Sequence, residues 1–273
     1  MLCISSSGVL GRYVPLEPGP AIWWRWLLAA LLLYAYCRYR GFKLAIGVGA
    51  QRRAVLISGL LMAIHWITYF YALKLSSVAV GMLAVFTYPA MTTLLEPLLT
   101  DKKLELHHLL LAVLVVVGVY FLAPGDLSLE NDMFSGMLFG LGSALIYSLR
   151  NIMMKKQVKT LNGSVIMLWQ VVVAVMVIVP FLFFSSALPT AEAVPYLVGL
   201  ALITTAIGHT LFLLSFKYFS ISSASLLSCI QPVYGILLGV LFFQEMPTGT
   251  SVIGGVLILS AVVVEALRTM RVA

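Results

Sequence analysis

Polar and aromatic side chains gather inside an apolar stretch at residues 53–73. His65, Trp66 and Tyr69 fall within one short segment of it. His65 and Tyr69 are four positions apart, so they would share a helix face that offers flat rings with hydrogen-bonding edges. Such a face suits a small amphipathic solute, including one with a cationic group. We predict that these three residues bind substrate. The alternatives are a hydrogen bond from His65 to a neighbouring helix and an aromatic belt at the lipid interface.

A polar stripe marks a second apolar stretch. Ser143, Tyr147, Arg150 and Asn151 recur at the spacing of one helix face. Tyr147 is deep in the stretch and is predicted to bind substrate. Arg150 lies near a basic segment, so its guanidinium would either extend to the interface or, facing inward, hold a carboxylate in a charge role.

Two prolines follow polar residues inside apolar stretches, as Tyr88-Pro89 and Gln231-Pro232. Proline leaves the carbonyl four residues earlier without its helical donor, and in lipid that carbonyl needs another partner. We therefore predict that Pro89 and Pro232 act as hinges or kinks, and that Tyr88 and Gln231 bind substrate. The alternative is a packing kink whose carbonyl is satisfied by Ser or Thr side chains.

Two titratable residues complete the candidates. His209 is predicted to bind substrate, with a hydrogen bond to Thr205 or to a backbone carbonyl as the alternative. Glu96 lies near the end of its apolar stretch and is a candidate for proton exchange. The alternative for Glu96 is an ion pair with Lys102 or Lys103 at the interface.

Other kinds of chemistry have no motif in the sequence. The phosphate-binding pattern GxxxxGK[ST] and metal-ligand spacings of Cys and His are both absent. We expect no catalytic residue, no metal, no cofactor and no use of ATP. The net charge of +7 would suggest nucleic acid for a soluble chain, but in a membrane chain the placement of the cations matters more. We expect no nucleic-acid partner.

The composition determines which elements hold these residues. Of 273 residues, 62% are apolar and 10% are charged, whereas soluble domains have about 25% charged residues. This excludes a soluble enzyme, a disordered chain and a secreted disulfide scaffold. A helix needs about 20 apolar residues to cross a bilayer. Nine stretches qualify, at residues 20–37, 53–73, 77–99, 105–123, 133–153, 163–186, 193–216, 220–243 and 249–267.

Residues 1–14 are apolar but too short to span. We expect them to be the second half of a truncated first helix, or else a half-helix packed against its neighbours. The expected fold is therefore an all-α integral membrane protein, a ten-helix bundle with an incomplete first helix. Loops after even-numbered helices and the C-terminus hold nearly all the Lys and Arg, which predicts a cytoplasmic C-terminus. The compact loops suggest a bacterial inner (plasma) membrane.

The sequence also contains an internal repeat. A shift of 143 residues aligns 63–98 with 206–241 and sets His209 opposite Trp66. The most informative identities are Lys74 with Lys217, Ser77 with Ser220, and Pro89 with Pro232. A unit of five helices is odd, so the two copies, residues 1–124 and 133–268, would be inverted. Inverted repeats are typical of secondary transporters, although a duplication without transport is the alternative.

These features together resemble the EamA-type transporters of the drug/metabolite transporter superfamily. The resemblance rests on the two five-helix units with Pro89 and Pro232 in the fourth helix of each. The segment Trp24-Arg25-Trp26 and the pairs Gln231-Pro232 and Gln244-Glu245 also contribute to it. It implies ten helices around a central cavity for a small-molecule substrate. The sequence departs from the pattern at its incomplete first helix, and Lys102 stands where the second copy has Glu245.

The sequence thus predicts a secondary transporter that moves a small metabolite, amino acid-like or another small organic solute, by alternating access. Proton-coupled export is one mode it allows. A phosphorylated anion would need several deep cations, and only Arg25 and Arg150 are candidates. The alternatives are a channel, a non-transporting membrane subunit, or an intramembrane hydrolase built on Ser143 and His209. Oligomeric state is left open.

Overall fold

The computed structural model describes residues 2–99, 106–123, 125–183, 188–218, 228 and 230–272. Helices account for nearly all of these residues, and no strand occurs among them. The expected all-helical fold is confirmed, although the count of ten helices is not.

Five helical segments are long and apolar enough to cross a membrane. They are α3 (Pro18–Tyr39), α4 (Gly49–Leu75), α8 (Asp132–Gln157), the segment Gly163–Phe183, which consists of α9 (Gly163–Ile178) and a 3-10 helix (Val179–Phe183), and the segment Ala193–Tyr218. All five begin within a few residues of the predicted positions. The remaining elements are α1 (Leu2–Ser5), α2 (Ser7–Arg12), α5 (Val78–Val85), α6 (Tyr88–Leu99), α7 (Leu106–Leu122), α13 (Ile230–Phe243) and α14 (Gly249–Val272).

The stretch at residues 77–99 was expected to form one helix, and it forms two. Helix α5 ends at Val85 and α6 begins at Tyr88, directly before Pro89. Proline has no N–H to donate to the preceding turn, so the helical hydrogen bonds lapse there. The matching break at Pro232 would involve residues 219–227 and 229, which lie outside the described residues.

Residues 193–216 were also expected to form one α-helix. The structure has α10 (Ala193–Gly199), a π-helix (Leu200–His209) and α11 (Thr210–Tyr218). In the π-helix the Thr204 hydroxyl donates to the Leu200 carbonyl at 2.6 Å, which competes with the α-helical hydrogen bond. π-Helical segments are rare in proteins overall, but those that occur are often at functional sites. The π-helix here ends at His209, so the region around His209 is a candidate functional region.

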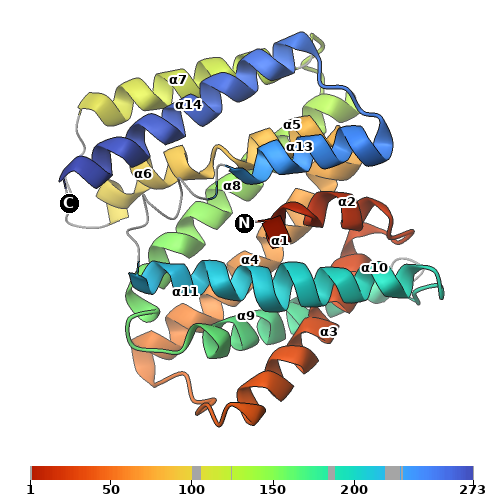
Figure 1. The fold of residues 1–273 in the computed structure, drawn as a ribbon, viewed down its shortest axis with the longest axis vertical. Helices are drawn as coiled ribbons and strands as arrows, with labels where there is room; N and C mark the ends of the chain where they lie inside the picture. Colours follow the sequence, from red (N-terminus) through yellow and green to blue (C-terminus); the bar gives the residue numbers. More distant parts are fainter. Residues whose placement is uncertain are drawn as a thin grey trace.

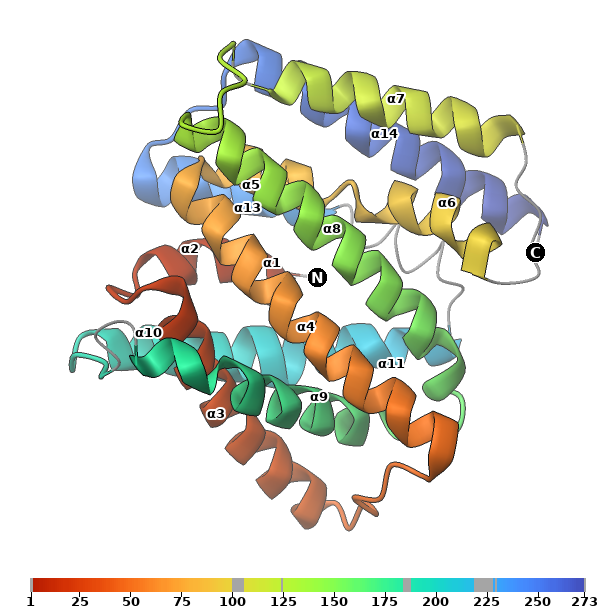
Figure 2. The same ribbon diagram turned by 180° about the vertical axis from the view of Figure 1, so that it is seen from behind.

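The helices pack into a slanted bundle in which α4 and α8 lie side by side through the middle (Figure 1). Helices α3 and α9 pack together beside α4, while α7 and α14 run along each other at one edge (Figure 2). Close contact of α8 with its neighbours depends on small residues. A Cβ at Gly136 would lie 2.8 Å from Cβ of Ser76, and one at Gly140 would lie 2.6 Å from Cβ of Ala84.

Candidate functional site

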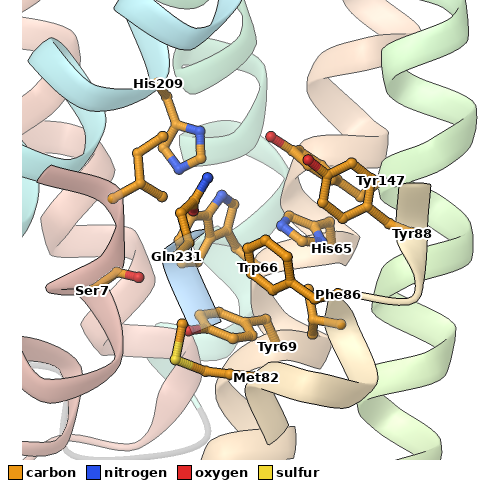
Figure 3. A pocket seen from close by; sticks show the side chains of 12 residues that line it. Ser7, His65, Trp66, Tyr69, Met82, Phe86, Tyr88, Tyr147, His209 and Gln231 are labelled. Atoms are coloured by element: carbon orange, nitrogen blue, oxygen red, sulfur yellow. The ribbon is translucent and has the colours of Figure 1, made fainter. Parts of the chain in front are cut away.

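A small cavity of about 30 Å³ lies among the helices at the centre of the bundle (Figure 3). This volume holds about one water molecule, so the wall must move apart before a metabolite can enter. The cavity is lined by Ile4, Ser7, His65, Trp66, Tyr69, Met82, Val85, Phe86, Tyr88, Tyr147, His209 and Gln231. All seven residues predicted to bind substrate are on this wall. They come from α4, α6, α8, the π-helix and α13, so the fold brings together residues from both halves of the chain.

Aromatic rings form most of one wall. The ring of His65 stacks on that of Tyr147 with centroids 4.4 Å apart, and Tyr147 meets Tyr88 edge-on at 4.9 Å. Trp66 contacts His209 edge-on at 5.2 Å. Figure 3 places Tyr88 and Tyr147 on one side of the cavity, and His209 and Gln231 on another. The cavity therefore offers flat surfaces together with hydroxyl, imidazole and amide groups.

His65 is held in place by Ser143 on α8. Its Nδ1 is 2.7 Å from Ser143 Oγ, and that hydroxyl donates to the backbone carbonyl of His65 at 2.8 Å. The hydrogen bond to a neighbouring helix, considered from the sequence as an alternative, thus coexists with a position on the cavity wall. The Ser143–His209 pair suggested for a hydrolase is not formed, because Ser143 is bonded to His65 and is fully buried.

The tyrosine hydroxyls also have partners. Tyr88 Oη lies 2.5 Å from Oγ of Ser228, which links α6 to the start of the α13 region. The Tyr69 hydroxyl faces α2, where a Cβ added at Gly8 would lie 3.5 Å from it. These contacts connect segments distant in sequence across the cavity. Gln231 is buried on the same wall.

Arg25 is fully buried although it was not among the predicted binding residues. Its Nε donates to Thr205 Oγ1 and its Nη2 to Thr204 Oγ1, both at 2.7 Å. Its guanidinium carbon lies 3.9 Å from the centroid of the Trp66 ring. Arg25 is thus fixed by the π-helix on one side and by a cavity-lining ring on the other.

Arg150 is also buried, so of the two orientations considered from the sequence its side chain takes the inward one. Its Nη1 donates to Asn151 Oδ1 at 2.9 Å and its Nη2 to Gln170 Oε1 at 2.6 Å. Gln170 in turn donates to Ser58 Oγ at 2.7 Å. The buried guanidinium thus has polar partners on α8 and α9, and the network continues to α4. These hydrogen bonds offset the cost of burying its charge inside the membrane.

Neither buried arginine is paired with a carboxylate in the described part of the chain. The ion pairs found there are Arg12–Glu245, Lys74–Glu17 and Lys155–Glu96. Glu96 is 2.8 Å from Lys155 Nζ, a partner that the sequence analysis did not name. The expected partners Lys102 and Lys103 lie outside the described residues.

Several buried donors have no hydrogen-bond partner among the described residues. They include Nδ1 and Nε2 of His209, Nε1 of Trp66 and Nη1 of Arg25. The expected bond between His209 and Thr205 is not formed, because Thr205 accepts from Arg25 instead. Since buried polar groups are nearly always hydrogen-bonded in proteins, this group of unpartnered atoms beside a cavity requires an explanation.

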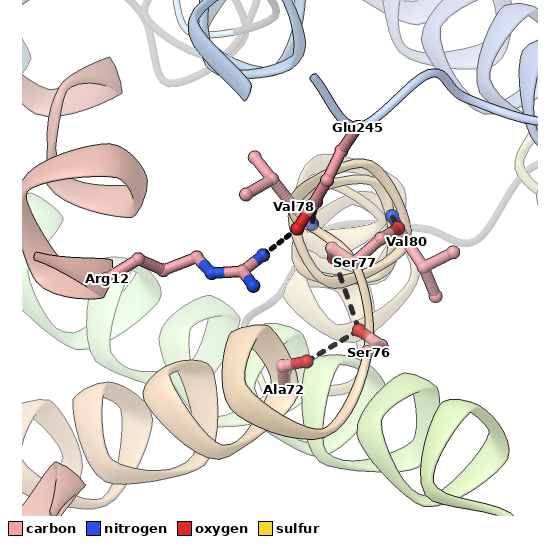
Figure 4. A network of polar contacts seen from close by, with 7 residues as sticks. All are labelled: Arg12, Ala72, Ser76, Ser77, Val78, Val80 and Glu245. Carbon is pink, nitrogen blue, oxygen red and sulfur yellow. Dashed lines mark hydrogen bonds and ion pairs between the residues drawn. The ribbon is translucent and has the colours of Figure 1, made fainter. Parts of the chain in front are cut away.

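A polar network joins the two halves at one end of the bundle (Figure 4). Arg12, at the end of α2, forms an ion pair with Glu245 in the α13–α14 connection. Glu245 also accepts from the backbone N–H of Val78 at 3.1 Å, at the start of α5. Ser77 caps this helix by accepting from the N–H of Val80. At the other end of the bundle, Lys155 of α8 meets Glu96 of α6.

Metal ligands do not cluster in the described ranges, where no group of three His, Cys, Asp or Glu side chains is close enough to hold an ion. The cavity residues that the sequence analysis missed are mostly apolar, such as Met82, Val85 and Phe86. Their side chains look like any other core residue, so periodicity gives no signal. Ser7 was missed because residues 1–14 were treated as one incomplete helix.

Comparison with known proteins agrees with this geometry. Residues 1–123 and 134–266 match the EamA-like transporter family. An uncharacterized transporter of Archaeoglobus fulgidus is 26% identical over 72% of this chain and 70% of its own length. The uncharacterized transporter YxxF of Bacillus subtilis is 21% identical over 98% of this chain and 87% of its own.

A solved crystal structure superimposes on 99% of this chain and 95% of its own length with a TM-score of 0.73. At 20% identity it supports the fold alone. The family match covers both halves of the chain, and the matched relatives are named as transporters. The protein is therefore a multi-pass membrane protein that belongs to the EamA-like transporter family.

Proposed function

We propose that the protein is a secondary transporter that carries a small organic metabolite across the membrane by alternating access. The observation that supports this most is the central cavity, whose polar and aromatic lining comes from both halves of the chain. A substrate site between two inverted units is the arrangement from which each unit can expose the site to one side. The units are residues 1–124 and 133–268.

Two ion pairs support the proposal further. Arg12–Glu245 joins the halves at one end, and Lys155–Glu96 joins them at the other. The shift of 143 residues that aligns the halves carries Arg12 onto Lys155. The acidic partners are not aligned by this shift, which sets Glu96 opposite Gly239 and Glu245 opposite Lys102. They do lie near the ends of α6 and α13, the helices that begin beside Pro89 and Pro232. The two contacts thus occupy similar places in the two halves, and each must break for its own end to open.

The distribution of Lys and Arg orients the molecule. We assign the Arg12–Glu245 end to the outer side and the Lys155–Glu96 end to the cytoplasm, with the C-terminus cytoplasmic in a bacterial inner membrane. Glu96 is the proposed proton site, because protonation of its carboxylate would release Lys155 and open the inner end. Pro89 and Pro232 would act as the hinges of α6 and α13.

Counterflow in proteoliposomes tests the proposal. Purified protein in vesicles preloaded with unlabelled solute should accelerate entry of the same labelled solute, with saturation, and vesicles without protein should not. A channel gives flux that does not saturate and no counterflow. Vesicles in which no organic solute shows saturable flux or counterflow would contradict the transporter assignment. A pH gradient should drive accumulation in the wild type and not in Glu96→Gln, while exchange persists.

A channel and a hydrolase are less well supported. A selective channel needs rings of charge or carbonyls along a continuous pore, and the described cavity wall has none. The Ser143 hydroxyl donates to the carbonyl of His65 and does not line the cavity. The residues that line the cavity therefore fit a substrate site of a transporter better than a channel pore or a hydrolase site.

A further inference from the structure

The buried charge around the cavity is positive. Arg25 and Arg150 are both buried, and the guanidinium carbon of each lies near a cavity-lining ring, 3.9 Å from the Trp66 centroid and 5.8 Å from the Tyr147 centroid respectively. The lining includes no Asp or Glu among the described residues. Buried cations are costly in a membrane protein unless a counter-charge is present. The described residues therefore give the two arginines beside the cavity no counter-charge, and an anionic solute would supply one.

Buried polar atoms without a partner occur on residues that line the cavity and on others that do not, the latter including Trp23, Trp26, Arg150 and Thr210. Trp66 and His209 line the cavity, contact each other and have ring nitrogens without a partner among the described residues. Arg25 stacks on Trp66 and retains an unpartnered Nη1. We call these three residues the Arg25 corner. Figure 3 shows His209, Trp66 and Gln231 gathered on this side.

The second arginine has a different environment. Both terminal nitrogens of Arg150 donate to amide oxygens, those of Asn151 and Gln170, and this network continues through Ser58 toward α4. On the same wall, His65 is already bonded to Ser143. Arg150 also keeps one unpartnered nitrogen, Nε, among the described residues. The difference is that the unpartnered nitrogens of Trp66 and His209 belong to residues that line the cavity beside Arg25, whereas His65 on the Arg150 side is already bonded.

We propose that the Arg25 corner binds the carboxylate of the substrate, and that the transported solute is an organic acid with a flat apolar body. This inference rests on the proposed transport function and specifies its substrate class. The indole N–H of Trp66 and one N–H of a neutral His209 donate to the carboxylate oxygens at the wall. Arg25, directly behind the indole, supplies the positive charge.

The chemistry of the remaining lining matches the body of such a solute, which would enter once the wall moves apart. The stacked rings of His65 and Tyr147, with Phe86 and Met82, offer flat and polarizable apolar surface. An ammonium group would meet two buried guanidiniums and no carboxylate among the described lining residues. The cavity should therefore bind a simple organic acid more tightly than the corresponding amino acid, and a lone amine least.

A matched set of four compounds tests the charge preference: 3-phenylpropionate, 3-phenylpropanamide, phenylalanine and 2-phenylethylamine. Each is added to the purified full-length protein, and its affinity is taken from the concentration dependence of the thermal midpoint. We expect 3-phenylpropionate to bind at least about tenfold more tightly than the amide, because a hydrogen bond to a charged group exceeds one to a neutral group. Equal stabilisation by the amide, preference for the amine, or stabilisation by none of the four would overturn the proposal.

A second experiment locates the corner. Trp66→Phe keeps a ring for Arg25 but removes the N–H donor together with part of the indole ring system, so affinity for 3-phenylpropionate should fall about tenfold. Trp23→Phe is the control, because Trp23 has a buried unpartnered Nε1 but does not line the cavity. Arg25→Gln should remove the preference for acid over amide. Unchanged affinity in a folded Trp66→Phe protein, or the same loss in Trp23→Phe, would overturn the placement.

The two proposals fail separately. If counterflow is found for a solute without a carboxylate, and the acid gains nothing over its amide, transport stands and the organic-acid assignment is wrong. If the acid binds at the Arg25 corner but no solute shows saturable flux, the binding site stands and the transporter assignment is wrong.

Discussion

The guanidinium carbon of Arg25 lies 3.9 Å from the centroid of the Trp66 ring, so a fully buried cation and a cavity-lining ring form one unit. The contact joins α3 to α4, and the Thr204 and Thr205 hydroxyls fix the other side of the guanidinium. In a desolvated setting a cation over an indole contributes about 2 kcal/mol. The position of the cavity wall therefore depends on a charge held behind it.

Replacing the Trp66 ring should expose this dependence. Trp66→Leu removes both the cation–π contact and buried aromatic packing, and we expect a loss of about 2–4 kcal/mol in unfolding free energy. Trp66→Phe retains a ring for Arg25 and should lose less than half as much. Unfolding in a fixed detergent, followed by the circular dichroism of the helices, measures the difference. Equal losses in the two variants would mean that Arg25 gains nothing from the ring.

Close packing of α8 gives a second prediction. A Cβ at Gly136 would lie 2.8 Å from Cβ and 2.9 Å from the backbone nitrogen of Ser76. Backbone atoms cannot move aside as a flexible side chain can, so Gly136→Ala should destabilise the protein by about 1–3 kcal/mol. Gly142→Ala, with nothing within 4 Å of its added Cβ, is the matched control and should be neutral or slightly stabilising. A neutral Gly136→Ala would contradict the helix contact described above.

Ser143 gives a third prediction, which separates a structural role from a catalytic one. Ser143→Ala leaves Nδ1 of His65 without its 2.7 Å hydroxyl contact, and we expect a loss of about 1 kcal/mol in stability. Counterflow should persist, measured at a temperature well below the midpoint of the variant. Ser260→Ala is the control, because that hydroxyl bonds only within its own helix, to the Leu257 carbonyl. A folded Ser143→Ala protein with no counterflow would indicate that the hydroxyl takes part in function.

The ion pair between Arg12 and Glu245 gives a fourth prediction. The two side chains are about one-third exposed, so the pair contributes only about 0.2–1 kcal/mol. Arg12→Glu should nevertheless favour opening at that end, and the exchange Arg12→Glu with Glu245→Arg should restore closure. A cysteine introduced at Ser7, on the cavity wall, in a background in which Cys3, Cys37 and Cys229 are replaced by Ser, reports opening through its rate of labelling by a membrane-impermeant thiol reagent added from outside.

The expected rise in labelling for the single variant is about two- to fivefold, in keeping with that energy. Lys74→Glu is the control, because Lys74 pairs with Glu17 within the first half of the chain. If the charge-exchanged protein labels as fast as the single variant, the ion pair does not hold that end closed. Glu245 also accepts a hydrogen bond from the backbone N–H of Val78, at the start of α5. If the charge exchange restores the slow labelling rate only in part, the remaining difference measures how much this bond to the α5 terminus contributes to closure.

Much of the fold could be predicted because lipid imposes a simple rule on sequence. Apolar runs of spanning length located α3, α4 and α8 to within a few residues, and a proline indicated the break before α6. The stripe of Ser143, Tyr147 and Arg150 could be seen because polar residues inside a membrane helix must face protein rather than lipid. The seven predicted binding residues could be identified for the same reason, although the sequence gives no distances between them.

A helical membrane protein with two similar halves and a polar, aromatic centre can thus be read from the residues alone, since helix length, apolarity and residue spacing are local properties. Which polar groups meet depends on the packing of the helices. This packing bonds His65 to Ser143, turns Arg150 inward to Gln170, and places Arg25 between the π-helix threonines and Trp66. These pairings depend on helix crossings between residues far apart in the chain, and packing geometry, which no periodicity encodes, decides them.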